Sequence, residues 1–296
     1  MFNKIIIAST FVLAGCLIFL IALSKLGWDF KGLSTKKLET NSYEITEDYQ
    51  DIIIETDTAD ITFVLSNDGK CLVECVELEK ETHSVLVSDN ALTIKRVDKR
   101  KLFDYIGFNL KKTKITVYLP SENYGNLNIN AKTSNIVVPN NFTFKNVNIE
   151  NSTGDVNFNS NAKSLDISVS TGKISLNGVS CEEDIKLSVS TGKVNINNLT
   201  CKNFDSTGDT GKVNLTSVIV SDKLSIKRST GDINLDSCDA GEIEVKTSTG
   251  DVTGTILSNK VFIVNTSTGK KNVPETTTGG ICKITTSTGN IIISIK

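Results

Sequence analysis

The chain has 296 residues, of which 39% are hydrophobic and 22% charged, so it carries enough apolar material for a folded core and is not a disordered protein. Its 32 basic and 34 acidic residues nearly cancel, to a formal net charge of -2. The strongly basic surface of a nucleic-acid-binding protein is therefore not expected, and nucleic acid is excluded as a partner.

The first predicted element is a membrane anchor over residues 1–25. Residues 5–24 form an uncharged apolar run between Lys4 and Lys25. At about 1.5 Å per helical residue, such a run spans the roughly 30 Å hydrocarbon core of a lipid bilayer as one transmembrane helix. Residues 13–16, Leu-Ala-Gly-Cys, have the form of a lipoprotein cleavage site with Cys16 as the lipidated residue. Because the sequence stays apolar after Cys16, we favour an uncleaved helix.

Residues 26–42 are predicted to be a linker, and the charges near it bear on the orientation of the anchor. Lys25, Lys31, Lys36 and Lys37 follow the apolar run, and by the positive-inside rule they place the rest of the chain in the cytoplasm. In contrast, an N-terminal signal-type segment normally exports the domain that follows it, and an Asn/Ser/Thr-rich repeat suits the cell exterior. We predict a single-pass protein of the cell membrane with its repeat domain extracellular.

Residues 43–124 are predicted to form an N-terminal β cap module. Short alternating segments are separated by turn residues such as Asn67-Asp68-Gly69, which favours mostly antiparallel pairing. These segments run over residues 52–54, 61–64, 72–76, 85–87, 92–94 and 115–119. Residues 58–61, Thr-Ala-Asp-Ile, resemble a diverged coil of the repeat described below. A cap is expected because the open end of a repeat stack would leave a free strand edge.

The seven cysteines suggest neither a disulfide framework nor a metal site. Cys71 and Cys75 lie four residues apart on one face of a strand, too far apart to form a disulfide. No CxxC pair occurs in the sequence and His83 is its only histidine, so a tetrahedral zinc site lacks a ligand set. We predict small buried thiols and expect no metal and no cofactor.

The last predicted element, residues 125–296, is a repeat with a period of 19 to 20 residues. Eight glycines that each follow a threonine recur at spacings of 18, 20, 19, 20, 19, 19 and 20 residues: Gly154, Gly172, Gly192, Gly211, Gly231, Gly250, Gly269 and Gly289. Glycine supplies the positive φ that a tight corner needs. Regular recurrence at this period is the sequence signature of a solenoid.

Each coil carries two alternating segments, one after its glycine and one before the next. Ile174 and Leu176 exemplify the first, at the second and fourth positions after Gly172, and Ile185 and Leu187 the second. Two strands per coil predict an all-β fold, a parallel β-solenoid with equivalent residues about 4.8 Å apart, right-handed like most parallel crossovers. The C-terminal residues 290–296 have no cap and are expected to end the stack, either as an exposed edge or as a docking edge.

The Ser-Thr-Gly-Asp/Lys-Val repeats occur together with Trp28-Asp29-Phe30 after the anchor and Val117-Tyr118-Leu119-Pro120 at the end of the cap. In these features the chain resembles a bacterial family of β-strand-repeat proteins of unknown function, catalogued as candidate adhesins. The resemblance covers nearly the whole chain. It implies a cell-envelope location in Gram-positive-like bacteria, and it assigns no site residues.

Catalysis is weighed because parallel β-helices can carry polysaccharide-degrading enzymes. From Gly125 to Lys296 there is no Trp, Tyr or His, so the aromatic platforms of sugar-processing grooves are missing. Asp155, Asp232 and Asp251 follow corner glycines, and Asp232 with Asp251 is weighed as a calcium ladder, but lysines in the same column favour a solvated charge row. The sequence predicts no enzyme, no small-molecule substrate and no catalytic, cofactor-binding or metal-binding residue.

Two function classes remain, and a third is less favoured. The first is a non-catalytic cell-envelope protein that displays its solenoid for adhesion or structural contact with an envelope polymer or protein. The alternative is an envelope-sensing accessory protein that signals through its membrane helix to a neighbouring regulator. A polysaccharide-active β-helix enzyme is the least favoured of the three.

Two local predictions follow from the period. Cys181 and Cys201 each lie nine residues after a corner glycine, so they should stack on adjacent coils as free thiols. Arg228, the only arginine of the repeat, should lie across Gly208 of the preceding coil. We expect its aliphatic stem to cover that glycine and its guanidinium to point outward, toward Asp209.

Overall fold

The computed structural model describes residues 12, 14–21, 24–25, 37–101 and 112–296. Residues 12, 14–21 and 24–25 are helical. Among the described residues, we find no helix with the length and apolar character that a membrane crossing requires. The remainder of the predicted anchor, and residues 26–36 of the predicted linker, lie outside the described residues. Both elements stay predictions.

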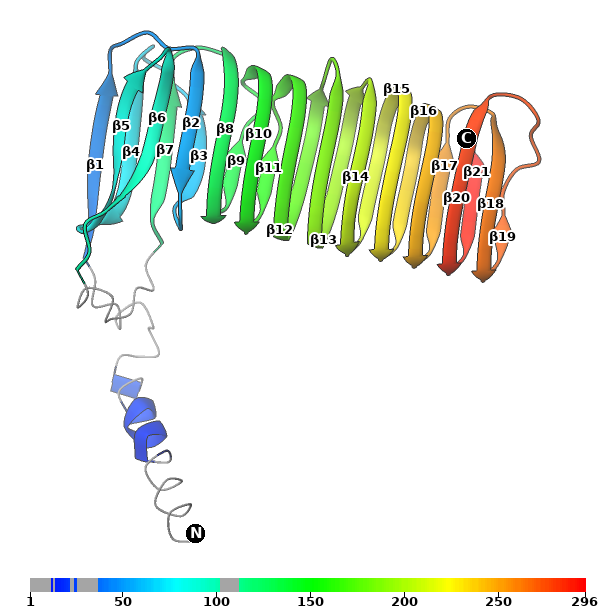
Figure 1. Cartoon of the computed structure of the whole chain (residues 1–296), viewed down its shortest axis with the longest axis horizontal. Helices are drawn as coiled ribbons and strands as arrows, with labels where there is room; N and C mark the ends of the chain where they lie inside the picture. Colours follow the sequence, from blue (N-terminus) through cyan, green and yellow to red (C-terminus); the bar gives the residue numbers. More distant parts are fainter. Residues whose placement is uncertain (1–11, 13, 22–23, 26–36, 102–111) are drawn as a thin grey trace.

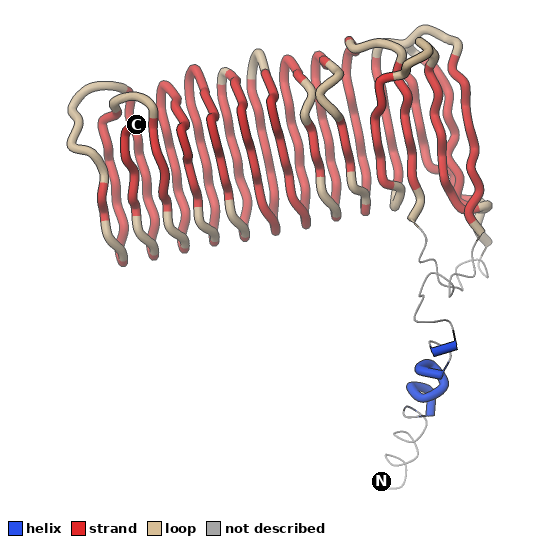
Figure 2. Tube along the Cα trace, turned by 180° about the vertical axis from the view of Figure 1, so that it is seen from behind, coloured by secondary structure: helices blue, strands red, loops and turns tan. Residues whose placement is uncertain are grey.

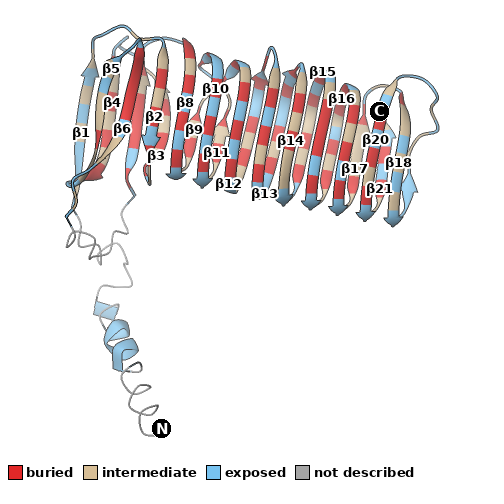
Figure 3. Cartoon of the chain, in the orientation of Figure 1, coloured by how far each residue is buried: buried red, intermediate tan, exposed pale blue. Residues whose placement is uncertain are grey.

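Residues 38–101 and 112–295 form a long stack of strands arranged as two facing sheets, joined at the corners of successive coils (Figure 1). Turns and loops gather along the two edges where the chain passes from one sheet to the other (Figure 2). Along each strand, buried side chains alternate with exposed ones, so one continuous core runs between the sheets (Figure 3). The predicted all-β, solenoid-like architecture is confirmed.

The N-terminal cap contains seven strands: β1 (Leu38–Ile45), β2 (Asp51–Thr56), β3 (Asp60–Leu65), β4 (Cys71–Leu78), β5 (Glu81–Ser88), β6 (Ala91–Asp98) and β7 (Lys114–Leu119). In one sheet, β1 pairs antiparallel with β4, β4 antiparallel with β7, and β7 parallel with β3. In the other, β5 pairs antiparallel with β6, and β6 parallel with β2. Strand β1 begins within the predicted linker.

Strands β2 and β3 are a coil of the solenoid rather than a separate module. Ile52 pairs with Leu127 of the first regular coil, and Ile61 pairs with Ile136, both in parallel register. The prediction that residues 58–61 are a diverged coil is therefore confirmed. Pairing within the cap is mostly antiparallel, as predicted, and its two inner strands pair in parallel because they continue the solenoid stack.

The regular coils supply the remaining strands. They are β8 (Asn123–Thr133), β9 (Ile136–Val138), β10 (Thr143–Thr153), β11 (Val156–Phe158), β12 (Asn161–Ser180), β13 (Asp184–Cys201), β14 (Asn203–Thr210), β15 (Val213–Thr230), β16 (Ile233–Thr249), β17 (Val252–Ile256), β18 (Lys260–Thr268), β19 (Lys271–Asn272), β20 (Gly280–Thr288) and β21 (Ile291–Ile295). Several of them, such as β12 and β13, pass through the glycine corner and pair in both sheets.

The glycine column at this corner is required by both conformation and space. Gly192 has φ +149° and pairs in register with Gly172. A Cβ placed on Gly192 would lie 1.6 Å from the Gly172 carbonyl oxygen, far inside any real contact. The corner therefore excludes every residue with a side chain, which explains why the glycine recurs at each turn.

The end of the stack departs from the sequence order. Strand β20 pairs on one side with β16 and on the other with β18, while β21 lies between β17 and β19. The coil of residues 280–295 is thus inserted between the two coils that precede it in the chain (Figure 1). The prediction that residues 290–296 end the stack is wrong, because the outermost strands are β18 and β19.

The reason lies in the inward-facing positions of the two coils. The inserted coil offers Ile291 and Ile293 after its glycine, and both are buried. The outer coil has Lys271 in register with Ile291, and this lysine is exposed. Burying a lysine between two apolar layers would cost several kcal/mol without a partner. At the end of the stack its ammonium reaches water, so this coil is stable only as the last one.

Candidate functional site

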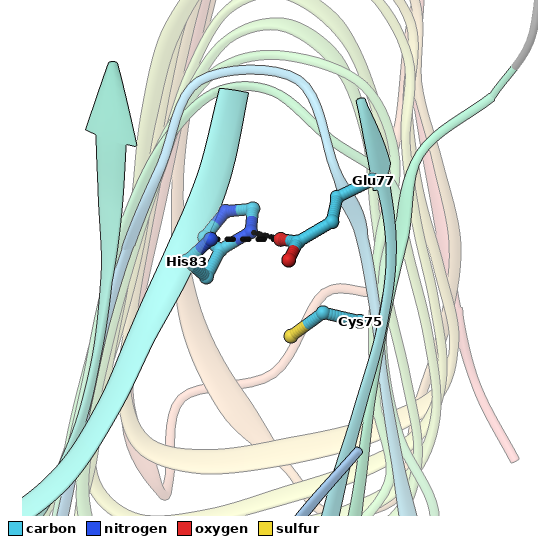
Figure 4. A group of neighbouring side chains, drawn as sticks. All are labelled: Cys75, Glu77 and His83. Carbon is cyan, nitrogen blue, oxygen red and sulfur yellow. Dashed lines mark hydrogen bonds and ion pairs between the residues drawn. The ribbon is translucent and has the colours of Figure 1, made fainter. Parts of the chain in front are cut away.

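The described residues contain one group of three neighbouring His, Cys, Asp or Glu side chains that could share a metal ion, and it lies inside the cap (Figure 4). Cys75 and Glu77 are two residues apart in β4, so both side chains point to the same face of the strand. His83 lies in β5, which returns from β4 through a tight hairpin turn. All three residues are buried, and one potential ligand atom from each lies within 4.8 Å of the other two.

A chain of hydrogen bonds fixes the His83 imidazole. Its Nδ1 lies 2.7 Å from Glu77 Oε2, and its backbone N–H donates to the same oxygen, also at 2.7 Å. Its Nε2 lies 2.9 Å from Thr56 Oγ1 in β2. The other Glu77 oxygen accepts a hydrogen bond of 2.6 Å from the Asn41 amide of β1. Four strands thus hold one carboxylate and one imidazole in place.

Cys75 lies beside this pair and is fully buried. Burial, with a smaller contribution from the Glu77 carboxylate, raises the pKa of its thiol to about 12. The Tyr43 hydroxyl donates to the His83 carbonyl oxygen at 3.0 Å, and burial followed by Glu77 and Cys75 raises its pKa as well. At neutral pH the Cys75 side chain is therefore a neutral thiol next to a buried carboxylate.

Thr56, His83 and Glu77 have the hydrogen-bond connectivity of a catalytic triad, but not its accessibility. A nucleophilic hydroxyl must meet a substrate and face donors for the developing oxyanion. Thr56 is 5% exposed, and its hydroxyl is already engaged by His83. We therefore interpret the chain of contacts as a buried polar network and not as an active site.

The acidic column at the glycine corner does not gather into a metal site. Asp232 Oδ2 lies 2.7 Å from Lys212 Nζ, and its Oδ1 accepts the Asp251 backbone N–H at 3.3 Å. Asp251 in turn accepts the Asn290 backbone N–H at 2.6 Å. Asp155 accepts the Lys173 N–H at 3.0 Å. These carboxylates join consecutive coils by capping backbone groups, and the bond to Lys212 lowers the pKa of Asp232.

The predicted pairing of Arg228 with Gly208 is confirmed, but the predicted direction of its side chain is wrong. It pairs with Gly208, and a Cβ added at that glycine would lie 3.1 Å from Arg228 Nη1. The guanidinium does not point outward, because Arg228 is only 5% exposed. Its Nη2 donates to Ser206 Oγ and its Nη1 donates to the Lys227 carbonyl oxygen, each at 2.9 Å. Ser206 and Gly208 are both small and inward-facing, so together they leave room for the whole guanidinium.

The outer surface above this arginine is hollowed. A shallow depression of about 480 Å³ crosses β13, β14, β15 and β16, and half of its lining residues carry a hydroxyl group. Its lining consists of Ser188, Ser190, Thr207, Gly208, Asp209, Lys227, Arg228, Ser229, Lys246 and Ser248. Because Gly208 and Arg228 both belong to this lining, the depression lies over the place where the guanidinium is buried.

Cys181 and Cys201 lie on adjacent coils, as their spacing predicted. Cys181 pairs with Ala162 of the preceding coil, and Cys201 pairs with Val220 of the following coil. Both are buried free thiols. Burial raises the pKa of Cys181 to about 11 and that of Cys201 to about 12. Neither thiol is set up for exchange at neutral pH, because the thiolate is the reactive form.

Sequence reasoning missed the group of Cys75, Glu77 and His83. The available signal was the Cys-x-Glu spacing in an alternating strand, which places both side chains inward. A hairpin turn at residues 79–80 then brings the first half of the next strand back over them. The prediction considered Cys75 with Cys71 and considered His83 alone, so it did not combine residues across the hairpin.

Comparison with solved structures finds the same fold in three bacterial proteins described as candidate adhesins. One is from Bacteroides fragilis NCTC 9343, with 17% identity and a TM-score of 0.50 over 89% of this chain and 99% of that one. A second is from Parabacteroides distasonis ATCC 8503, with 15% identity and a TM-score of 0.53 over 88% and 98% of the two chains. The third is from Parabacteroides merdae ATCC 43184, with 14% identity and a TM-score of 0.55 over 89% and 98%. At these identities the likeness shows the fold alone.

A search of curated proteins gives no significant match. Family comparison is decisive, because residues 49–294 match the family described as Toastrack DUF4097. This match covers every cap strand except β1 and nearly all of the solenoid. The chain belongs to the Toastrack DUF4097 family.

Proposed function

We propose that the chain is a non-catalytic cell-envelope protein that presents its solenoid for adhesive or structural contact with an envelope polymer or protein. The observation that carries this proposal is the periodic polar surface of the coils. Outward side chains in the same column hydrogen-bond from coil to coil, as in Asn146 to Asn126 at 2.8 Å, Asn197 to Asn177 at 2.9 Å and Asn214 to Asn195 at 2.9 Å. They present donors and acceptors at the spacing of the strands, about 4.8 Å.

Such a surface suits an extended ligand. Each contact between a hydroxyl or amide group and a polymer in water is weak, but many contacts at a regular spacing add through effective concentration. The depression above Gly208 adds a concave stretch across four coils, with Lys227 and Lys246 at one side. The candidate adhesins among the structural neighbours support binding as the general role, and the buried Thr56–His83–Glu77 network argues against catalysis there.

The proposal includes the anchor and the location. The apolar run of residues 5–24 supports a single-pass attachment to the cell membrane, and its N-terminal position supports export of the solenoid to the outside. Protease added to intact protoplasts should then remove the solenoid. Protection until lysis would instead favour the cytoplasmic orientation that the lysines after the run indicate.

Binding is tested with the full chain in detergent micelles, mixed with isolated envelopes of the source cells. Thr207→Arg with Ser248→Arg places two long side chains in the lining of the depression, and we expect envelope binding to weaken at least fivefold. Ser175→Arg on the outer face of the opposite sheet is the matched control and should bind like the wild type. Equal loss in both variants would point to charge alone, and no loss in either would remove the depression from the proposal.

A second experiment distinguishes adhesion from the alternative role as an envelope-sensing accessory protein. Mild crosslinking in intact cells, followed by capture of the chain, should recover an envelope polymer or surface protein. Recovery of a membrane-embedded regulator through the N-terminal segment, without any envelope component, would favour sensing over adhesion.

A further inference from the structure

We propose that Cys75, Glu77 and His83 form a zinc site, in which Cys75 Sγ, a Glu77 carboxylate oxygen and His83 Nδ1 bind one Zn²⁺ ion. Thiolate, imidazole and carboxylate are the protein ligands that Zn²⁺ prefers. The three ligand atoms come from β4 and β5 and lie within 4.8 Å of one another inside the cap (Figure 4). The site lies apart from the outer surfaces that carry the proposed adhesive role.

The spacing of the ligand atoms is close to that of a tetrahedral site. Zinc–sulfur bonds of about 2.3 Å and zinc–nitrogen or zinc–oxygen bonds of about 2.0–2.2 Å place tetrahedral ligands about 3.4–3.6 Å apart. In the structure His83 Nδ1 and Glu77 Oε2 are 2.7 Å apart, and all three ligand atoms lie within 4.8 Å. Zinc binding therefore needs the Glu77–His83 pair to open by less than about 1 Å and the wider separations in the group to close by up to about 1.4 Å.

The surrounding residues match the supports that metal ligands usually have. A histidine that binds a metal through one ring nitrogen normally donates the N–H of the other to a fixed acceptor. Thr56 Oγ1 is such an acceptor, 2.9 Å from His83 Nε2. The carboxylate is held in the same way, because Asn41 donates to the Glu77 oxygen that does not face His83.

Charge balance also favours a divalent cation. Glu77 is 1% exposed, and a buried carboxylate is costly unless positive charge lies next to it. On binding, zinc displaces the proton of the Cys75 thiol, which passes to solvent, and the His83 N–H moves from Nδ1 to Nε2. One Zn²⁺, one thiolate and one carboxylate then sum to zero charge. The three protein ligands leave one tetrahedral position for a small ligand such as water.

Zinc at this position would join the two sheets where the solenoid begins. Strand β4 belongs to one sheet and β5 to the other, and their hairpin closes the end of the core. A ligand that binds the folded state alone stabilises it by RT ln(1 + [L]/Kd). The inference therefore assigns the buried cluster a stabilising role at the capped end and not a catalytic one.

The test uses the full chain without an affinity tag, in detergent micelles, with Cys16 replaced by serine because that cysteine is exposed. After equilibration with Zn²⁺ and desalting, elemental analysis should find about one zinc ion per chain. Replacing Zn²⁺ with Co²⁺ should give a thiolate-to-cobalt charge-transfer band and the visible bands of tetrahedral cobalt. Cys75→Ser and His83→Gln should each weaken binding at least tenfold, and Thr56→Val should weaken it less.

Cys282→Ser is the matched control, because Cys282 is also fully buried but lies in β20 at the far end, and it should bind zinc like the parent protein. The proposal is wrong if the parent retains no zinc, or if Cys75→Ser retains as much as Cys282→Ser. Should Cys75→Ser fail to fold, the cobalt spectrum of the parent decides. A spectrum without the thiolate band excludes Cys75 as a ligand.

Discussion

The inserted C-terminal coil places Lys260 in an ion pair that spans strand β20. Lys260 opens β18 in the outermost coil, yet its Nζ lies 2.6 Å from Asp239 Oδ1 in β16, two coils away. Its side chain passes over β20 at Gly280, whose Cβ, if present, would lie 3.8 Å from Lys260 Cδ. Ser258 Oγ also contacts the Lys260 ammonium at 2.6 Å. The Lys260 stem therefore crosses the inserted strand β20 to reach its partner in β16.

Replacing Lys260 with methionine keeps the stem and removes the charge. Lys260 is 4% exposed, so the change leaves the Asp239 carboxylate without its cation in a partly buried position. Removing one partner of a buried pair costs about 3–5 kcal/mol, and we expect the lower part of this range because the Asp239 side chain is 21% exposed. Asp239→Asn should cost less, and the double variant should recover at least 1 kcal/mol relative to the sum of the two.

Two measurements check this reasoning. Denaturant unfolding of the four proteins in the cycle gives the coupling energy, and additive effects would mean that Lys260 and Asp239 do not touch. Hydrogen exchange reports the strand order directly, because amides of an inner strand are better protected than those of an edge strand. Residues 282–286 of β20 should exchange more slowly than residues 261–266 of β18. Slower exchange in β18 would refute the inserted order.

Three further predictions concern the core and the corner. Gly192→Ala should lower the free energy of unfolding by more than about 3 kcal/mol, because the added Cβ meets the Gly172 carbonyl oxygen at 1.6 Å. Gly178 also has a positive φ, +67°, but open space around it, so Gly178→Ala should cost only about 1 kcal/mol in the same thermal melts. Gly208→Ala should lower the free energy of unfolding by about 3 kcal/mol, because the new Cβ would lie 2.0 Å from the Val189 carbonyl oxygen. Arg228→Met should lower it by only about 1–2 kcal/mol, and equal losses of stability in denaturant titrations would contradict this reasoning. Burial raises the pKa of Cys75, Cys201 and Cys282 to about 12, so these thiols keep their protons in the folded chain above pH 9, where the unfolded chain loses them. The contribution of these thiols to stability should therefore be fully present below pH 9. As the pH rises from 9 toward 12, the free energy of unfolding should fall by on the order of 1 kcal/mol per pH unit for each thiol. An unchanged urea midpoint between pH 8 and pH 10 would refute this prediction.

The repeat could be predicted from the sequence because its two strongest signals are local. A corner that tolerates no Cβ forces a glycine at each turn, and Gly172 and Gly192 pair in the register that their spacing indicates. The alternating residues on either side of the glycine then decide which side chains enter the core. Ile174 and Leu176 are buried as their positions predict.

The order of the last coils could not be predicted by assuming that neighbours in sequence are neighbours in space. The contrary signal was present, because Lys271 occupies the second position after Gly269, where the other coils place an aliphatic residue. An outer position lets that lysine reach water. The buried group at Cys75, Glu77 and His83 was missed for a related reason, since it depends on a hairpin that joins residues from two sheets.

Arg228 and Lys260 are two cases of one packing device. In each, a glycine on the neighbouring strand leaves out a side chain, and a long cationic side chain from the next coil occupies the space and bonds to a polar group beyond it. Gly208 admits the Arg228 guanidinium, and Gly280 lets the Lys260 stem cross to Asp239. The glycine opposite Arg228 is particular to one coil, because the other regular coils carry a side chain in the Gly208 column. A stack of nearly identical coils has many competing registers, and the contact between Arg228 and Gly208 favours the observed one at a place where the apolar repeat is interrupted.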